Sequence, residues 1–316
     1  MRDVVFLFPG QGSQQVGMGK DLWERHASVK RLFEEASDLL GTDLTALCFE
    51  GPSETLVQTD NVQPAITLVN LATAQVLREE GITPAAAAGH SLGEYAALAA
   101  AGVFSFAETL SLVQFRGTVM KEAADRHPGG MLAVFGLDLE SMSAVCREVG
   151  EVGSVEVANH NSPNQVILTG EHAALKAAGE LAKQEGAKLT VPLKVSGPWH
   201  SRFMGEARDK MQARLTEVHP GRPSFPVIAN VAADAYPDDP EGIRARLVEQ
   251  IVRPVRWADS VTRLVQSGHR LFVEVGPGKV LTGLMRDISR DVVALSVQDE
   301  AGLAKLRATS THPPAS

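Results

Sequence analysis

The chain has 316 residues, of which 44% are hydrophobic and 22% charged, and its formal net charge is −8. This length and composition predict one large globular domain or two, with ample hydrophobic core. The negative charge argues against a general nucleic-acid binder, and no apolar run is long enough to predict a membrane-spanning helix.

The first part of the chain alternates strands with helices. The apolar run Val4–Phe8 is typical of a buried parallel strand, and a glycine-rich loop follows it at 9–15. An alanine run at 85–88 predicts a second strand, and helical patterns occupy about 26–40, 63–80 and 106–124. This alternation indicates the α/β class, with a mostly parallel sheet covered by helices on both faces.

The pattern changes after His127, where Pro128-Gly129-Gly130 marks a boundary. The next segment is expected to form a strand, a helix, two strands, a helix and a strand, which is the βαββαβ order of a ferredoxin-like unit. The expected ranges are 131–135, 139–148, 155–159, 165–170, 171–185 and 187–193. We therefore expect a small domain inserted over 128–195, a large domain formed by 1–127 and 196–300, and a tail over 301–316.

The segments after the predicted insert complete the large domain. They are expected to form helices at about 202–217, 243–251 and 257–267, and strands at 225–230, 271–275 and 292–295. A further helix is expected to follow Gly276-Pro277-Gly278-Lys279 and to end at about residue 288. The crevice between two such domains is a favoured place for a ligand.

Gly89-His90-Ser91-Leu92-Gly93 lies between the alanine strand and a helical stretch and has the pattern Gly-x-Ser-x-Gly. In a nucleophile elbow, this pattern places the serine on a sharp strand-to-helix turn with its Oγ exposed. The next backbone N–H, that of Leu92, is then positioned to bind an oxyanion. Ser91 is a candidate nucleophile; the alternative is a structural turn, because glycine and serine are common in turns.

A serine nucleophile needs a base, and His200 is the best placed of the nine histidines. It follows the rigid stretch Gly197-Pro198-Trp199 at the junction with the predicted insert. No acid for a triad is evident between Ser91 and His200, so an amide or a backbone carbonyl is expected to hold the imidazole. Gln250 is the candidate for this role; alternatively, it is a surface glutamine near a helix end.

Arg116 carries a charge on an apolar helix flank. Its neighbours one turn away are Leu112, Val113, Val119 and Met120, and a bare charge is costly in such surroundings. Three interpretations remain open: an internal salt bridge, a side chain that snorkels to the surface, or bidentate recognition of a ligand carboxylate.

Taken together, several segments resemble the malonyl-CoA:acyl carrier protein transacylase family, which includes the acyltransferase domains of polyketide and fatty acid synthases. The matching segments lie in family order between about residues 3 and 297. They are Phe8-Pro9-Gly10-Gln11-Gly12-Ser13-Gln14, Gly89-His90-Ser91-Leu92-Gly93-Glu94, Gln114-Phe115-Arg116-Gly117, Gly129-Gly130-Met131, Ala158-Asn159-His160-Asn161-Ser162-Pro163, His200-Ser201 and Glu274-Val275-Gly276-Pro277-Gly278. The family's fold, a hydrolase-like α/β domain with a ferredoxin-like insert, agrees with the order of elements expected above.

The resemblance implies an acyltransferase, specifically an [acyl-carrier-protein] S-malonyltransferase. It would move a malonyl group from malonyl-CoA to the phosphopantetheine thiol of acyl carrier protein by a ping-pong mechanism. Ser91 would form the acyl-serine, and His200 would act as its general base, oriented by Gln250. The backbone N–H groups of Gln11 and Leu92 would bind the oxyanion.

The resemblance also assigns residues to the acyl pocket. Arg116 would pair with the free malonyl carboxylate, and Asn159 would lie near the acyl chain or the pantetheine. Trp199 stands where many relatives carry serine or phenylalanine, at a position linked to acyl choice. Its bulk predicts a preference for malonyl over methylmalonyl groups.

Two other activities are consistent with the same residues. One is an acyl hydrolase that acts on acyl-carrier-protein or acyl-CoA thioesters with water as the acceptor. The other is a trans-acting acyltransferase for a different extender unit. A docking module without catalysis is disfavoured, because the serine, the histidine and both oxyanion loops are present. Both fatty acid and polyketide synthesis remain open as the pathway.

Cys48 and Cys146 are far apart and lack metal-ligand spacing, so we expect no disulfide framework and no metal site. The chain enters its first strand directly, without the pattern of a signal peptide, which predicts a cytoplasmic protein. We expect no bound cofactor, since coenzyme A would arrive in the thioester substrate and phosphopantetheine on the partner. Malonyl-CoA and acyl carrier protein are the expected partners of a monomer that binds neither nucleic acid nor membrane.

Overall fold

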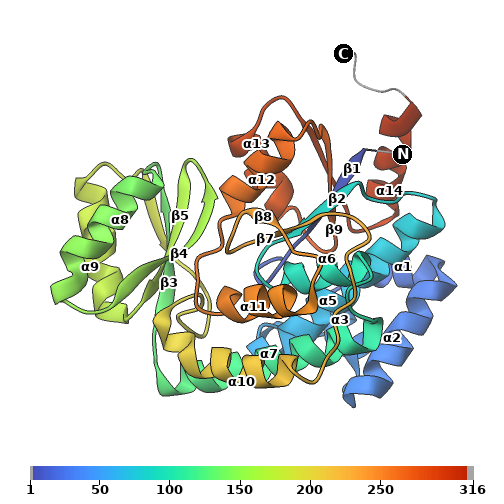
Figure 1. Cartoon of the computed structure of the whole chain (residues 1–316), viewed down its shortest axis with the longest axis horizontal. Helices are drawn as coiled ribbons and strands as arrows, with labels where there is room; N and C mark the ends of the chain where they lie inside the picture. Colours follow the sequence, from blue (N-terminus) through green and yellow to red (C-terminus); the bar gives the residue numbers. More distant parts are fainter. Residues whose placement is uncertain (1–2, 312–316) are drawn as a thin grey trace.

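The computed structural model describes residues 3–311, and these form two β-sheets (Figure 1). The larger sheet has six strands in the order β10-β9-β1-β2-β7-β8, and every neighbouring pair is parallel except β7 and β8. Its strands are β1 (Val4–Phe8), β2 (Ala86–Gly89), β7 (Val227–Ala229), β8 (Asp234–Ala235), β9 (Leu271–Val275) and β10 (Val293–Val297). The expected α/β fold with a mostly parallel sheet is confirmed.

Helices cover both faces of this sheet, which explains why β1 is apolar throughout. Val4, Phe6 and Phe8 enter one hydrophobic cluster, whereas Val5 and Leu7 enter another on the opposite face. Two helices contribute side chains to the second cluster: α12 (Trp257–Gln266) and α13 (Val280–Ile288). The helices that contribute to the first cluster include α1 (Lys20–Arg25), α2 (Ala27–Leu40), α3 (Leu44–Phe49), α4 (Ser53–Leu56), α5 (Thr59–Glu79), α6 (Gly93–Ala100), α7 (Phe106–Arg126), α10 (Gly205–Leu215) and α11 (Pro240–Gln250).

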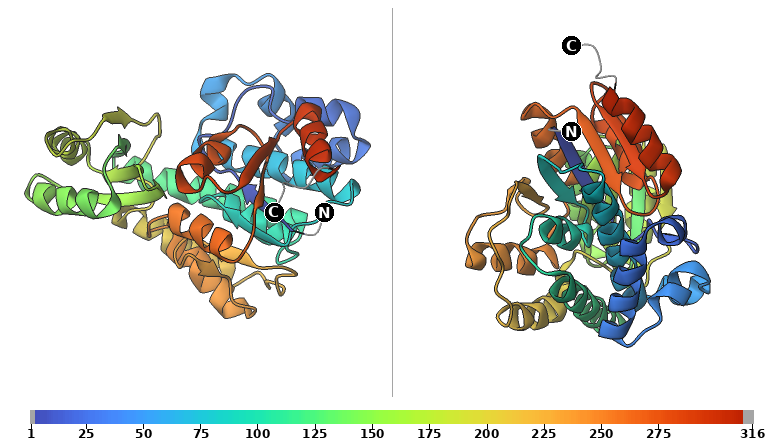
Figure 2. Two further views of the ribbon diagram at one scale, coloured as in Figure 1. Left: turned by 90° about the horizontal axis from the view of Figure 1, so that it is seen from above. Right: turned by 90° about the vertical axis from the view of Figure 1, so that its right-hand side faces the viewer.

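The second sheet has four antiparallel strands in the order β4-β5-β3-β6. Its elements follow the chain as β3 (Gly130–Phe135), α8 (Leu139–Glu148), β4 (Val155–Ser162), β5 (Gln165–Gly170), α9 (His172–Gln184) and β6 (Leu189–Pro192), with the short helix η1 (Val149–Glu151) after α8. This is the expected ferredoxin-like order. The sheet and its helices project from one side of the larger body (Figure 2).

Backbone hydrogen bonds join the small sheet to the larger body beside the carboxyl end of β2. The N–H of Val255 donates to the carbonyl oxygen of Ala158 at 2.8 Å, and the N–H of His160 donates to that of Val255 at 2.9 Å. These bonds lie on either side of Asn159, so this residue of β4 is held at the junction of the two sheets.

The prediction of a tail from residue 301 is wrong. Glu300–Thr311 forms helix α14, and Leu303 and Leu306 of this helix are fully buried in the main hydrophobic cluster. Two leucines three positions apart lie on one face of a helix and pack it against the core, although the surrounding sequence is polar. Residues 312–316 of the predicted tail lie outside the described residues. The short helices α1, α3 and α4 were not predicted, and the helix expected from residue 202 begins with the separate turn η2 (Arg202–Met204).

Candidate active site

Ser91 lies on a sharp turn between β2 and α6, with a backbone φ of 50° in the left-handed region. The strand is built from alanines and ends at Gly89, and the helix begins at Gly93. A Cβ on Gly89 would overlap the backbone of Gly93, and one on Gly93 would overlap the carbonyl of Phe8. Glycines are therefore required for this close approach, and the turn has the geometry of a nucleophile elbow.

Ser91 and His200 are in direct contact although 109 positions separate them. The Oγ of Ser91 lies 2.7 Å from Nε2 of His200, and Nδ1 of His200 lies 2.9 Å from the backbone carbonyl oxygen of Gln250. A carbonyl only accepts, so Nδ1 carries the proton and Nε2 is free to accept the serine proton. This geometry is that of an activated serine whose base is oriented by a carbonyl instead of a carboxylate.

His200 is held as a neutral base by its surroundings. Burial lowers the pKa of His200 to about 3, and the nearby positive charge of Arg116 acts in the same direction. The imidazole therefore remains unprotonated at neutral pH and can take a proton from Ser91.

Arg116 lies in the middle of α7, which begins at a capping box formed by Ser105 and Glu108. Its side chain is 1% exposed. Its Nη1 donates to Oε1 of Gln63 at 2.9 Å, and its Nη2 donates to Oγ of Ser91 at 3.2 Å and to Oε1 of Gln250 at 3.0 Å.

Both structural alternatives for Arg116 are thereby excluded. The side chain does not reach solvent, and its three acceptors are neutral oxygens. Within residues 3–311 it forms no ion pair, and its Nε has no hydrogen-bond partner. A desolvated cation next to a nucleophile, with no carboxylate in direct contact, is suited to bind an anionic group of the substrate.

Gln250 is fully buried, so the alternative of a surface glutamine is also excluded. Its backbone carbonyl accepts from His200, while its side chain contacts Arg116 and donates to the carbonyl oxygen of Ser91 at 2.7 Å. One residue thus touches the base, the cation and the elbow.

The loop after β1 supplies the second candidate donor for an oxyanion. Asn70 anchors the loop by donating from Nδ2 to the carbonyl oxygen of Pro9 at 2.9 Å, and Gly10 packs against the carbonyl of His90. Gln11 and Leu92 consequently line one cavity with Ser91. In the part of the chain that the structure describes, neither of their N–H groups has a protein acceptor, as an oxyanion hole requires.

This cavity has a volume of about 340 Å³ and lies between the two sheets. Asn159 and Trp199 line it, 6% and 5% exposed respectively. The Nδ2 of Asn159 is 3.3 Å from Nε2 of His90, and Oδ1 of Asn159 and Nε1 of Trp199 have no partner among the described residues. All the residues predicted for the site thus lie close together. Gln250 alone does not line the cavity, but it contacts Ser91, Arg116 and His200, which do.

Sequence reasoning did not identify two polar side chains that complete the site. Gln63 accepts from Arg116, and Oδ1 of Asn230 accepts from the backbone N–H of Ser91 at 2.7 Å. Both are fully buried, Gln63 within α5 and Asn230 in the turn just after β7. A polar residue at a core position is the one signal by which the sequence could have indicated them.

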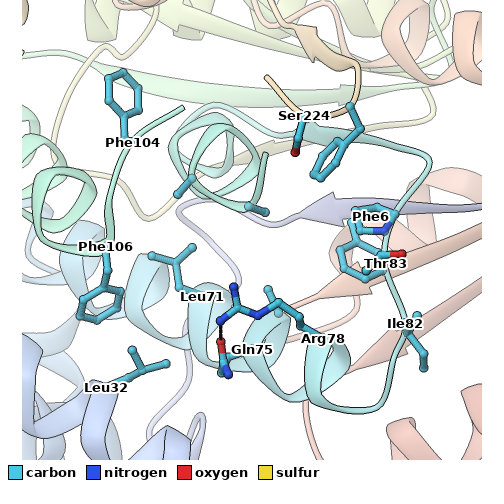
Figure 3. Close-up of a pocket in the computed structure, with 15 residues that line it drawn as sticks. Phe6, Leu32, Leu71, Gln75, Arg78, Ile82, Thr83, Phe104, Phe106 and Ser224 are labelled. Carbon is cyan, nitrogen blue, oxygen red and sulfur yellow. Dashed lines mark hydrogen bonds between the residues drawn. The ribbon is translucent and has the colours of Figure 1, made fainter. Parts of the chain in front are cut away.

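A second hollow, of about 550 Å³, lies beside the segments that precede β2 and β7 (Figure 3). Its lining is mainly apolar, with Phe6, Leu71 and Phe104 among the side chains, and Arg78 extends over it and bonds to Gln75. It lies away from the carboxyl ends of the strands, where the serine, the histidine and Arg116 converge.

Residues 3–311 lack two structural features. No helix is both long and apolar enough to cross a membrane. No group of three or more histidine, cysteine, aspartate or glutamate side chains is arranged to hold a metal ion.

The fold and the serine–histidine geometry are those of an α/β enzyme that acts through a serine nucleophile. A family model described as acyl transferase domain matches residues 5–310. The chain therefore belongs to the acyl transferase family.

Relatives and solved structures narrow this class. The chain is 43% identical over 300 residues to a malonyl CoA-acyl carrier protein transacylase of Bacillus subtilis, covering 95% of this chain and 94% of the relative. A malonyl-transacylase solved in complex with a type II polyketide synthase acyl-carrier protein superposes with a TM-score of 0.93 at 42% identity, covering 96% and 98% of the two chains. The transacylase structure from Coxiella burnetii gives a TM-score of 0.95 at 36% identity, with 98% of each chain covered.

The lowered pKa of His200 predicts that its imidazole does not titrate near neutrality. Between about pH 5.5 and about pH 8, the NMR signals of the His200 ring should stay at the positions of the neutral form with the proton on Nδ1, because its pKa of about 3 lies below this range. The His200→Gln variant identifies the signals. A midpoint near the ordinary value of about 6.5 would contradict the described environment.

Proposed function

We propose that this chain transfers a malonyl group from malonyl-CoA to the phosphopantetheine thiol of acyl carrier protein, through an acyl-serine at Ser91. The names of its relatives, malonyl CoA-acyl carrier protein transacylases, support the reaction. The complex of a similar malonyl-transacylase with its acyl-carrier protein supports the acceptor.

The observation that carries this proposal is the position of Arg116. Its Nη2 lies 3.2 Å from the Ser91 oxygen, and in residues 3–311 no carboxylate pairs with it. A malonyl group attached to Ser91 carries a free carboxylate, which would bind directly to this guanidinium. An esterase for neutral acyl chains would only bear the desolvation cost of this cation, so the hydrolase alternative has no observation in its favour.

In the first half-reaction, Oγ of Ser91 attacks the thioester carbon of malonyl-CoA while Nε2 of His200 accepts the hydroxyl proton. The N–H groups of Gln11 and Leu92 stabilise the negative oxygen of the tetrahedral intermediate. The C–S bond then breaks, and the sulfur of coenzyme A leaves with the proton from His200.

In the second half-reaction, the pantetheine thiol of acyl carrier protein gives its proton to His200 and attacks the malonyl-serine ester. Ser91 leaves and regains its proton from His200. A thioester is consumed and a thioester is formed, so the overall free-energy change is small and the transfer is reversible.

Trp199 restricts the space beside the acyl group. Its indole is buried against the backbone at Gly197 and lines the cavity that holds Ser91 and Arg116. A branch on the α-carbon of the acyl group would need volume that this side chain occupies. We therefore propose that Trp199 favours malonyl over methylmalonyl groups, with Asn159 bordering the acyl chain or pantetheine.

Incubation with radiolabelled malonyl-CoA tests the reaction. The wild-type chain should retain covalent label that holo acyl carrier protein discharges, whereas Ser91→Ala should retain none. Release of free malonate without transfer would identify a hydrolase, and label on Ser91→Ala would place the nucleophile elsewhere.

Removal of the cation tests the carboxylate contact. Arg116→Ala should lose about 2–5 kcal/mol in kcat/KM for malonyl-CoA, because the malonyl carboxylate is left unpaired in a buried site. Acetyl-CoA, which lacks this carboxylate, is the matched control substrate and should lose far less. An equal loss for both thioesters would exclude Arg116 as the carboxylate-binding residue.

Competition between two acyl-CoA substrates tests Trp199. The wild-type chain should prefer malonyl-CoA to methylmalonyl-CoA by about 10- to 200-fold in kcat/KM, the range for one methyl group in a pocket. Trp199→Ala should narrow this ratio and Trp199→Phe should give an intermediate value. Equal use of both substrates by the wild-type chain would refute the steric argument.

A further inference from the structure

Glu94 is a buried carboxylate next to the site for which the proposed reaction provides no role. It lies in the first turn of α6, three residues after Ser91, and its side chain is fully buried. Its Oε1 accepts from the backbone N–H of Asn230 at 2.8 Å and from the hydroxyl of Tyr236 at 2.9 Å, and its Oε2 accepts from Nε2 of Gln250. Within residues 3–311 no lysine, arginine or histidine forms an ion pair with it.

A single amide separates this anion from the buried cation of Arg116. The side chain of Gln250 donates from Nε2 to Glu94 and accepts at Oε1 from Nη2 of Arg116 at 3.0 Å. A carboxylate only accepts and a guanidinium only donates, so the amide between them has one allowed orientation. The same Nε2 also donates to the carbonyl oxygen of Ser91, which ties the orientation to the elbow.

The opposite charges of Glu94 and Arg116 explain why both can remain buried. An unpaired guanidinium and an unpaired carboxylate are each costly in a protein interior, and opposite charges at short range there attract strongly. The titratable groups that face Glu94 are Arg116, Tyr236 and Tyr95 of its own helix. Burial raises the pKa of Tyr95 to about 12 and that of Tyr236 well above its usual value, so both stay neutral. Arg116 is therefore the cation that balances Glu94.

We infer that Glu94 is the counter-ion of Arg116, held one amide away so that the guanidinium is stabilised but still free to bind the carboxylate of the acyl group. Glu94 is a positioning residue that acts through Gln250. A carboxylate in direct contact with Arg116 would compete with the substrate. This inference rests on the proposed function, since it requires a substrate that carries a carboxylate.

The arrangement also makes the pKa of Glu94 depend on whether a substrate carboxylate is bound to Arg116. Burial raises the pKa of Glu94 to about 7, while the hydrogen bonds and the positive charge of Arg116 act in the opposite direction. A substrate carboxylate that neutralises Arg116 removes part of this stabilisation of the anion. The pKa of Glu94 should then rise, and the side chain should take up a proton near neutral pH.

A pair of variants separates the charge of Glu94 from its shape. Glu94→Gln keeps the shape, removes the charge and replaces one acceptor oxygen by an NH2 group, which must face either the NH2 group of Gln250 or the N–H of Asn230. Glu94→Asp keeps the charge and shortens the side chain. The ratio of kcat/KM for malonyl-CoA to that for acetyl-CoA should fall at least about tenfold in Glu94→Gln and be largely retained in Glu94→Asp. An unchanged ratio in Glu94→Gln, or a larger loss in Glu94→Asp, would overturn the inference.

A second measurement leaves Glu94 intact and so does not depend on the folding of those variants. The carboxyl carbon of Glu94, labelled with carbon-13, is titrated by NMR in Ser91→Ala, with Glu94→Asp used to assign the signal. Saturating malonyl-CoA should move the midpoint to higher pH, whereas saturating acetyl-CoA should leave it in place. Binding of malonyl-CoA without a shift would overturn the role of Glu94 alone, while failure of malonyl-CoA to bind would overturn the proposed function itself.

Discussion

The site is organised by a cation that the protein itself does not neutralise directly. Arg116 is buried between helices and donates to the neutral oxygens of Gln63, Ser91 and Gln250. Desolvating a guanidinium without a direct carboxylate partner costs free energy in the empty enzyme. Hydrogen bonds to two amide oxygens and one hydroxyl offset part of this cost, and we propose that the charge of the more distant Glu94 offsets a further part. In the proposed reaction, Arg116 would bind the far carboxylate of the malonyl group while Ser91 attacks its thioester.

Close packing of the backbone at the elbow places Ser91 next to Arg116. The alanines of β2 and the glycines at 89 and 93 let the strand and α6 approach until a single methyl group would not fit. Ser91 adopts a left-handed conformation that costs free energy for a residue other than glycine. Asn230 stabilises it by accepting from its N–H and donating to the carbonyl of Gly89 at 2.7 Å each. Strain and packing together fix Oγ between the base and the cation.

Much of this arrangement could be predicted from local patterns. Continuous apolar runs and the elbow motif predicted β1, β2 and Ser91, and the apolar neighbours of Arg116 marked it as unusual. The hydrogen bonds that the side chains of Glu94, Asn230 and Gln63 form around the site could not be predicted, because their partners lie 53 to 156 positions away in the sequence and no spacing rule connects them. Helix α14 was missed for a different reason: its stability comes from burying Leu303 and Leu306, which is a tertiary effect that a polar local composition conceals.

The structure of the acyl-enzyme tests the central claim most directly. Crystals of the wild-type chain, exposed to malonyl-CoA and frozen before discharge, should show an ester at Oγ of Ser91. The free carboxylate of the malonyl group should accept from the guanidinium of Arg116, with Gln250 still bridging Arg116 and Glu94. An acyl group on another residue, or a malonyl carboxylate directed away from an unpaired Arg116, would contradict the account.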